Sequence, residues 1–291
     1  MRMILVHGIN QQGKCSQKIL DEWLYSLHAT YATLGHDPLG KLSRIEAAFY
    51  GDTLEQLSSV KLKSEAIALG AEEAPEDFDE FAVDALKEMA LRMGVTEAQI
   101  EAEVSETAVA QGAGPHKKLL KAIARVIETV SPFHGTLALC VLGQAHAYIR
   151  NQHVHDEVNK LVHPLFEHDE PAIVVSHSLG TIVAYSMLRE FAKYGRPRQS
   201  PMLVTLGSPL GIDSVRRGFP KPRIKPDNVL RWVNGADPED FVALRPELTN
   251  DNFGPGIENY PDIENGYENP HSIAGYLSDT RIAKAIAESI P

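Results

Sequence analysis

The chain has 291 residues, of which 43% are hydrophobic and 23% are charged, and this composition fits one large α/β domain with an insertion, or two small domains. The formal net charge of -11 argues against nucleic acid as a main partner. Two cysteines are too few for a disulfide framework, the first residues do not fit a signal peptide, and no apolar stretch is long enough to span a bilayer. We therefore expect a cytoplasmic protein without a transmembrane segment.

The first predicted strand, Met3–Val6, leads into a loop that nearly matches a phosphate-binding loop. In that interpretation Gly8–Lys14 would hold a nucleotide phosphate, but the next residue is Cys15, whose thiol is a poor ligand for magnesium. In addition, no later apolar strand ends in the aspartate that such a protein needs for its metal. A nucleotide-binding protein that uses Gly8–Lys14 therefore stays only as an alternative.

A second interpretation of this loop starts from the pair His7-Gly8. Directly after the first strand, this pair is typical of the oxyanion loop of a serine hydrolase. A backbone N–H just beyond Gly8, from Ile9 or Asn10, would then face the N–H of Leu179 across a developing negative charge.

Two further elements complete the first part of the chain. The pattern 16–34 predicts a helix, and the partly alternating residues 43–50 predict a second strand. Asp52 follows this strand, at the edge where open α/β sheets bind ligands, but we expect it to serve only in the turn.

Residues 54–143 are predicted to form an almost wholly helical insertion between two strands of the sheet. The predicted helices cover residues 81–93, 97–109 and 116–130, and a more apolar helix follows Pro132; an acidic run at 71–80 and a linker at 111–115 interrupt them. Such a block is typical of a cap over an active site. We therefore expect a core of residues 1–53 and 144–291 and a cap of residues 54–143, which is also a candidate surface for a protein partner.

Four histidines precede the next predicted strand, and they are His146, His153, His155 and His163. The spacing of the first three does not bring them onto one helical face, and no cysteine or tight acidic cluster joins them. We expect no metal site and no cofactor, and we interpret 144–166 as the helix that leads into that strand.

The strongest local signal begins with Ala172–Val175, a short apolar and β-branched run that predicts a buried strand. A helical pattern follows from Thr181 to about Ala192. Ser178 lies between them, and a serine on such a strand-to-helix turn is typical of the nucleophile elbow, Gly-x-Ser-x-Gly. Small neighbours are needed because the turn strains the backbone, and this sequence has Ser176 and Gly180 there.

Two more strands are predicted in the second half, at 202–206 and 229–233. Ser208 follows the first of them without an elbow pattern, so we expect it to have a structural role. The loop after the second strand contains Asp237 and Asp240, and either carboxylate is a candidate for the acid in a Ser–Asp–His order.

His271 lies in a late loop, before a predicted terminal helix at 279–289. It follows the acidic loop in the order that a catalytic base requires. His177 is excluded as the base because, within the turn, its side chain would point to the side of Ser178.

The motifs that carry a wider resemblance are Leu5–Gly8, Val174–Gly180, Thr205–Pro209, Trp232–Val242, Pro270–Ser272 and Gly275–Tyr276. With these motifs the chain resembles serine hydrolases of the α/β-hydrolase superfamily, in the esterase and lipase group. The resemblance covers nearly all of the chain outside the insertion, and it implies a mostly parallel sheet with helices on both faces. The chain departs from the pattern twice. The strands that usually precede the His-Gly strand are missing, so the sheet is reduced at its N-terminus, and the helical cap precedes the nucleophile strand instead of following it.

The resemblance also implies roles for the candidate residues. In related esterases a Trp-x-Asn strand is followed by Asp-Pro-x-Asp, which makes Asp240 the acid and leaves Asp237 in reserve. With Ser178 as nucleophile and His271 as base, we expect a serine esterase or lipase that cleaves a small-molecule or lipid carboxylic ester, although thioester and amide hydrolysis are chemically close. A hydrolase-like scaffold that acts through its helical insertion is the other alternative.

Overall fold

The computed structural model describes residues 1–58, 76–107, 115–130, 134–194, 200–266 and 269–291. The strands are β1 (Arg2–Val6), β2 (Arg44–Ala48), β3 (Ala172–His177), β4 (Ser200–Leu206), β5 (Val229–Gly235) and β6 (Ile257–Tyr260). They form a six-stranded sheet in the order β2-β1-β3-β4-β5-β6, and every neighbouring pair is parallel. The prediction of an α/β fold around a parallel sheet is confirmed.

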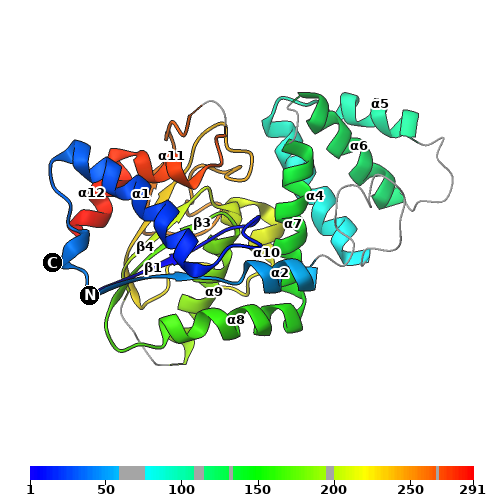
Figure 1. Ribbon diagram of the computed structural model, residues 1–291. Helices are drawn as coiled ribbons and strands as arrows, with labels where there is room; N and C mark the ends of the chain where they lie inside the picture. The colour runs from blue at the N-terminus through cyan, green and yellow to red at the C-terminus, as the bar shows by residue number, and fades with distance from the viewer. Residues whose placement is uncertain (59–75, 108–114, 131–133, 195–199, 267–268) are drawn as a thin grey trace.

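Helices cover both faces of this sheet, as predicted (Figure 1). One face carries α1 (Ser16–Leu34), α11 (Ile273–Ser278) and α12 (Thr280–Glu288), and the other carries α8 (Gln152–Phe166) and α9 (Leu179–Lys193). Alternate residues of a strand point to opposite faces, and the two cores follow this rule. Leu5 and Val175 are buried with α1 and α12, whereas Val6 and Val174 are buried with α8 and α9.

The helical insertion lies at one end of the sheet (Figure 1). Its elements in the described parts are α2 (Gly51–Ser58), α4 (Glu76–Arg92), α5 (Glu97–Thr107), α6 (Pro115–Val130) and α7 (His134–Arg150). Their buried side chains belong to the same hydrophobic cluster as those of α8 and α9. The helix α7 continues without a break across residue 143, where we expected the cap to end.

Several elements differ from the sequence-based expectations. The helix expected over 144–166 is in fact two helices, because the Asn151 side chain accepts hydrogen bonds from the N–H groups of His153 and Val154 and so caps α8. The strand β6, the helix α11 and the short helices α10 (Asp213–Arg217), η1 (Leu39–Lys41) and η2 (Pro209–Gly211) were not predicted. The linker at 111–114 and residues 71–75 of the acidic run lie outside the described residues.

Within the parts of the chain that are described, no helix has the length and hydropathy of a membrane span.

Candidate active site

Ser178 lies at the turn between β3 and α9, and its backbone has the unusual φ of 55° and ψ of -131°. A non-glycine residue with positive φ is strained, so the surrounding contacts must hold it in place. The Ser178 N–H donates to the carbonyl of Leu206 at 2.9 Å, which ties the turn to β4. A side chain at Gly180 would overlap the carbonyl oxygens of Val6 and His7, so α9 can begin here only with glycine at this position.

Ser176 takes the place of the first glycine in the elbow pattern, and the structure accommodates it without a clash. Its hydroxyl donates a hydrogen bond of 2.8 Å to the carbonyl of Val204 on the neighbouring strand. The predicted strand–turn–helix around Ser178 is therefore present, with a serine hydroxyl used to join two strands.

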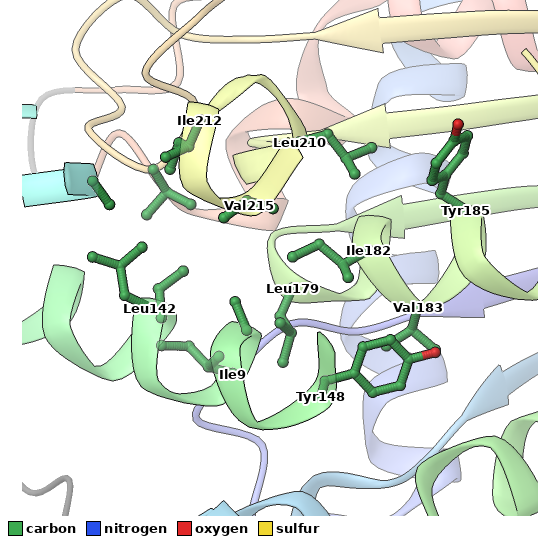
Figure 2. Packing of buried hydrophobic residues seen from close by; sticks show 14 of the residues in the cluster. Ile9, Leu142, Tyr148, Leu179, Ile182, Val183, Tyr185, Leu210, Ile212 and Val215 are labelled. Carbon is green, nitrogen blue, oxygen red and sulfur yellow. The ribbon is translucent and has the colours of Figure 1, made fainter. Parts of the chain in front are cut away.

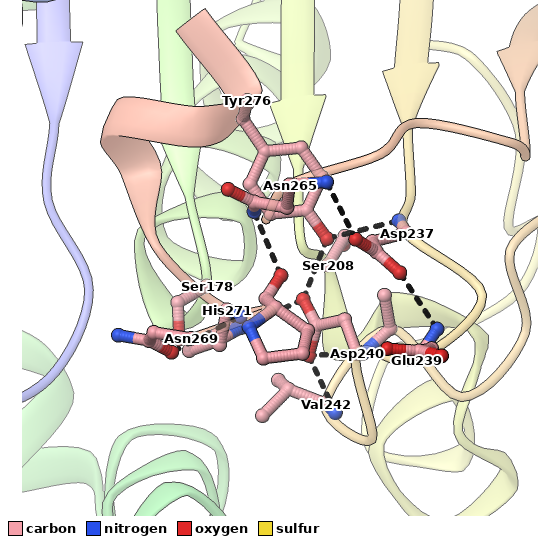
Figure 3. A network of polar contacts seen from close by, with 12 residues as sticks. Ser178, Ser208, Asp237, Glu239, Asp240, Val242, Asn265, Asn269, His271 and Tyr276 are labelled. Atoms are coloured by element: carbon pink, nitrogen blue, oxygen red, sulfur yellow. Dashed lines mark hydrogen bonds and ion pairs between the residues drawn. The ribbon is translucent and has the colours of Figure 1, made fainter. Parts of the chain in front are cut away.

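His271 comes from the loop before α11 and lies beside Ser178 (Figure 3). Its Nε2 is 2.8 Å from the Ser178 hydroxyl oxygen, and its Nδ1 is 2.7 Å from Asp240 Oδ2. The three side chains come from the loops after β3 and β5 and from the loop before α11, and they meet because parallel strands place their carboxyl ends at one edge of the sheet. The structure thus brings together the serine, histidine and aspartate selected from the sequence.

Asp240 is fully buried and is surrounded by hydrogen-bond donors. Besides His271, Oδ2 accepts a bond of 2.6 Å from the Tyr276 hydroxyl, and Oδ1 accepts one of 2.9 Å from the Val242 N–H. Burial alone would raise the pKa of Asp240, but the positive charge available on His271 and these hydrogen bonds outweigh burial and hold the pKa below its usual value. Asp240 is therefore a carboxylate at neutral pH.

Asp237, the other candidate acid, has a different set of partners (Figure 3). Its carboxylate accepts hydrogen bonds of 2.7 Å from the backbone N–H groups of Glu239 and Asn265. It therefore joins the loop after β5 to the loop that leads to His271. The structure shows no hydrogen bond between Asp237 and His271 in the described residues.

The loop after β1 approaches Ser178 closely at Gly8, where an added Cβ would lie 2.5 Å from the Cβ of Ser178. The orientation of the next peptide is set by His7. The Tyr50 N–H donates to His7 Nε2 at 3.2 Å, so the ring proton is on Nδ1 and donates to the Gly8 carbonyl at 2.7 Å. Because a trans peptide is planar, the N–H of Ile9 points away from His7.

The other expected backbone donors also lie at this edge. Leu179 is the first residue of α9, so its N–H has no acceptor within the helix and lies at the positive end of the helix dipole. Asn10 has a φ of 59°, in the left-handed region, and its side chain is exposed.

Burial keeps two histidines next to the site neutral. It lowers the pKa of His7 to about 4, and, together with the charge of His271, it lowers the pKa of His177 to about 3. The His177 ring centroid is 4.6 Å from that of His271, and the same ring contacts Trp23 edge-on. His177 therefore packs beside His271, and Nε2 of His271 contacts Ser178, as the sequence interpretation required.

Sequence reasoning did not find what Tyr276, His7 and His177 do in the site. Tyr276 was noticed only as part of a motif, and its contact with Asp240 joins residues 36 positions apart. The pattern His-Gly gave a signal for the loop but none for the ring of His7. Nothing in the sequence indicated that His177 would lie against His271.

Apolar side chains surround the start of α9 (Figure 2). They come from the loop after β1, from α7 of the insertion, from α9 and from α10, and they include Ile9, Leu142, Leu179, Ile212 and Val215. Ser178 is 1% exposed and His271 is 8% exposed. Both side chains are therefore nearly closed off from solvent, and the apolar residues around the start of α9, called the apolar cover below, lie next to Ser178, which directly precedes this helix.

A polar contact fastens the insertion to the core beside this cover. Glu88 of α4 accepts a bond of 2.7 Å from Arg245 and another of 3.1 Å from the N–H of Asp213. Nearby, Arg217 forms an ion pair with Asp84, also on α4. The insertion is thus bonded to both the loop after β5 and the start of α10.

The loop 8–15 does not have the contacts expected of a phosphate-binding loop. Lys14 forms an ion pair of 2.6 Å with Glu22, and the N–H of Gly13 donates to the Asp52 carboxylate at 2.7 Å. Two of the groups that would hold a phosphate, the Lys14 ammonium and the Gly13 N–H, thus already have partners within the protein, and Asp52 ties its turn to this loop.

The histidines before β3 also have ordinary surroundings. The His146 ring lies edge-on to Phe78 and Phe81, and His155 contacts Tyr148. Within the residues that the structure covers, no three histidine, cysteine or acidic side chains gather in a way that could hold a metal ion.

Comparisons of the chain with protein-family models, with curated proteins and with solved structures found no match. The function of the site must therefore be inferred from its own side chains.

Proposed function

We propose that the protein is a serine hydrolase of the α/β-hydrolase type that cleaves a carboxylic ester through an acyl-enzyme on Ser178. The observation that carries this proposal is the hydrogen-bonded chain from Ser178 through His271 to Asp240, with distances of 2.8 and 2.7 Å. Nucleophilic catalysis by serine requires a base within hydrogen-bond reach and a third group that orients the base.

In the proposed reaction, His271 Nε2 accepts the proton of Ser178 as the hydroxyl oxygen attacks the ester carbonyl. Asp240 keeps the Nδ1 proton of His271 in place and stabilises the imidazolium that forms. His271 then gives the proton to the leaving alcohol, and the acyl group stays on Ser178. Attack of water, with His271 again as the base, releases the acid and restores the enzyme.

The negative charge on the carbonyl oxygen needs donors that are already oriented. The N–H groups of Leu179 and Ile9, or of Asn10 in place of Ile9, are the proposed donors. The bond from His7 to the Gly8 carbonyl supports Ile9, because it fixes the orientation of the Gly8–Ile9 peptide. Because His7 is neutral, its hydrogen bond to the Gly8 carbonyl is present at the pH at which esters are hydrolysed.

The surroundings favour an ester with an apolar acyl group. Ile9, Leu142 and Val215 lie around the start of α9, and the ring of Phe241 is 6.3 Å from that of His271. Since Ser178 is 1% exposed, side chains around it have to move before a substrate can reach it. Esters of longer fatty acids should therefore react better than acetate esters, because they gain more from apolar contact.

The test is labelling with a fluorophosphonate, which reacts with activated serines. The wild type should be labelled on Ser178, and Ser178→Ala should lose both labelling and ester hydrolysis, the latter by a factor on the order of 10⁵ or more. Ser208→Ala is the matched control, since Ser208 is buried nearby and its hydroxyl bonds to Thr181 at 2.8 Å. Folded wild-type protein that is not labelled, or equal labelling of Ser178→Ala, would contradict the proposal.

A further inference from the structure

A hollow of about 510 Å³ lies on the α9 side of the sheet, apart from the residues discussed above as the active site. Its walls come from α10, from the loop between α10 and β5, and from the loop between β5 and β6, and they include Arg216, Lys221, Arg223, Asn250, Asn252 and Phe253. The ring of Phe253 packs against Tyr185 of α9 at 5.0 Å, which fixes the position of the hollow on this face.

Positive charge is concentrated here although the chain as a whole carries a net charge of -11. Three of the seven wall residues are basic, and in the described structure neither Lys221 nor Arg223 forms an ion pair with a carboxylate. Burial, followed by the charge of Arg216 and smaller contributions from Arg189 and Arg217, lowers the pKa of Arg223. Arg216 and Arg217 each pair with one carboxylate, whereas in the described residues Lys221 and Arg223 do not, so an anion beside these two side chains would be stabilised.

Arg216 also has an unused donor. Its terminal nitrogen bonds to Asp213 at 2.9 Å, but its buried Nε has no hydrogen-bond partner in the described residues. A buried N–H without an acceptor costs free energy, so the protein does not fully satisfy the Arg216 side chain.

Two side chains in the walls of the hollow are held by hydrogen bonds. The Nε of Arg223 donates to the Phe219 carbonyl at 2.9 Å, so its guanidinium is held in one place. Asn252 bonds through both ends of its amide, to the N–H of Thr249 and to the carbonyl of Glu247. Ordered cations bind an anion with less loss of conformational entropy than mobile ones.

We propose that this hollow binds a phosphate-type anion, that is, the phosphate group of a mono- or diester. Guanidinium groups match the oxygen atoms of a phosphate, and about 510 Å³ leaves room for an organic substituent. The phosphate comes either from a small soluble ester or from a lipid headgroup, because the chemistry of recognition is the same. The site is independent of Ser178 and of the function proposed above.

The test uses inorganic phosphate in isothermal titration calorimetry at low salt, and sedimentation with phosphatidylcholine vesicles that contain or lack phosphatidic acid. Lys221→Gln removes an exposed charge, and Arg223→Gln removes a fixed guanidinium. Each substitution should weaken the binding of the probe by about tenfold relative to the wild type, as expected for one lost charge-assisted hydrogen bond. Lys160→Gln, which removes an exposed charge on α8, should bind like the wild type.

The outcomes separate the possibilities. Binding of inorganic phosphate without pelleting on phosphatidic acid vesicles indicates a soluble ester, and pelleting that depends on phosphatidic acid indicates a lipid headgroup. Ser178→Ala should bind phosphate as the wild type does, whether or not the protein is a hydrolase. The proposal is overturned if neither probe binds, or if Lys160→Gln weakens binding as much as Lys221→Gln. Lys221→Gln keeps the test valid if Arg223→Gln does not fold.

Discussion

The Tyr276 hydroxyl donates a hydrogen bond of 2.6 Å to Oδ2 of Asp240, the same oxygen that His271 contacts. Burial and the neighbouring Asp240 raise the pKa of Tyr276 well above its usual value, so the hydroxyl keeps its proton. The tyrosine oxygen in turn accepts the N–H of Asp237 at 3.1 Å. One hydroxyl therefore orients the proposed catalytic acid and ties it to the loop that follows β5.

Tyr276→Phe should slow the labelling of Ser178 by about tenfold to a hundredfold, because a hydrogen bond to a charged group contributes about 1.5–3 kcal/mol. It should also lower the free energy of unfolding by about 1–3 kcal/mol, since the N–H of Asp237 loses its buried acceptor. Labelling kinetics and urea unfolding measure the two effects. Tyr25→Phe, an exposed change on α1, is the control, and labelling of Tyr276→Phe at the wild-type rate would show that the hydroxyl does not support Asp240.

Asp240→Asn and Asp237→Asn should differ sharply. The first removes the negative charge that faces His271 and favours the wrong ring tautomer, so ester hydrolysis should fall by a factor on the order of 10⁴. The second keeps a side-chain oxygen for the backbone N–H of Glu239 or Asn265, so hydrolysis should stay within about tenfold of the wild type. Steady-state rates with one p-nitrophenyl ester test this, and equal losses in the two variants would mean that Asp240 is not the acid.

Gly180→Ala should destabilise the protein by about 3 kcal/mol or more, because the new methyl group meets backbone carbonyls of Val6 and His7 that cannot move independently. Ser176→Gly should cost only about 1–2 kcal/mol, through the lost bond to Val204 and the added freedom of glycine. Urea unfolding of the two variants gives the comparison. A Gly180→Ala protein as stable as Ser176→Gly would disprove the close approach of β1 to α9.

The buried His177 should make the protein less stable in mild acid. Its pKa is about 3 in the folded state and near 6.5 in the unfolded chain, so the unfolded chain binds the proton first and stability falls as pH drops below 6.5. Between pH 7 and pH 5 this contribution is about 2 kcal/mol. Over this interval the free energy of unfolding of His177→Gln should fall by about 2 kcal/mol less than that of the wild type. Chemical denaturation at each pH measures the difference.

His153→Gln, the same substitution at an exposed position of α8, is the matched control for these measurements. The pKa of His7 is lowered as well, so the His177→Gln protein should still lose some stability in acid, through His7. An unchanged profile in His177→Gln would show that this ring is not held neutral in the fold.

Elements with local signals could be predicted from the sequence. The apolar run of β3 and the small residues around Ser178 define a strand and a tight turn. Once a serine is suspected, the order along the chain points to His271 and leaves Asp237 and Asp240 as candidate acids, and the resemblance to esterases favours Asp240. The signals for the strand and the turn lie within a few residues of the features that they predict, and the structure brings Ser178, Asp240 and His271 together.

The remaining elements depend on contacts between distant residues. The strand β6 has four residues with a single aliphatic side chain, and it is a strand because β5 pairs with it. The six residues of α11 are too few for a helical period to be recognised. The role of Tyr276 could not be derived either, because it depends on how the loop after β5 meets α11.

The pairing of β1 with β3 has a consequence for the order of folding. Arg2 bonds to the carbonyl of Glu170, 168 residues later, and β1 lies between β2 and β3 in the sheet. Closing so long a loop is slow, whereas α4, α5, α6 and α7 pack on one another over a shorter stretch of the chain. Gly8 reaches Ser178 only after this closure. We therefore expect a newly made chain to form its helices early and to bring Gly8 and Ser178 together only when the sheet is complete.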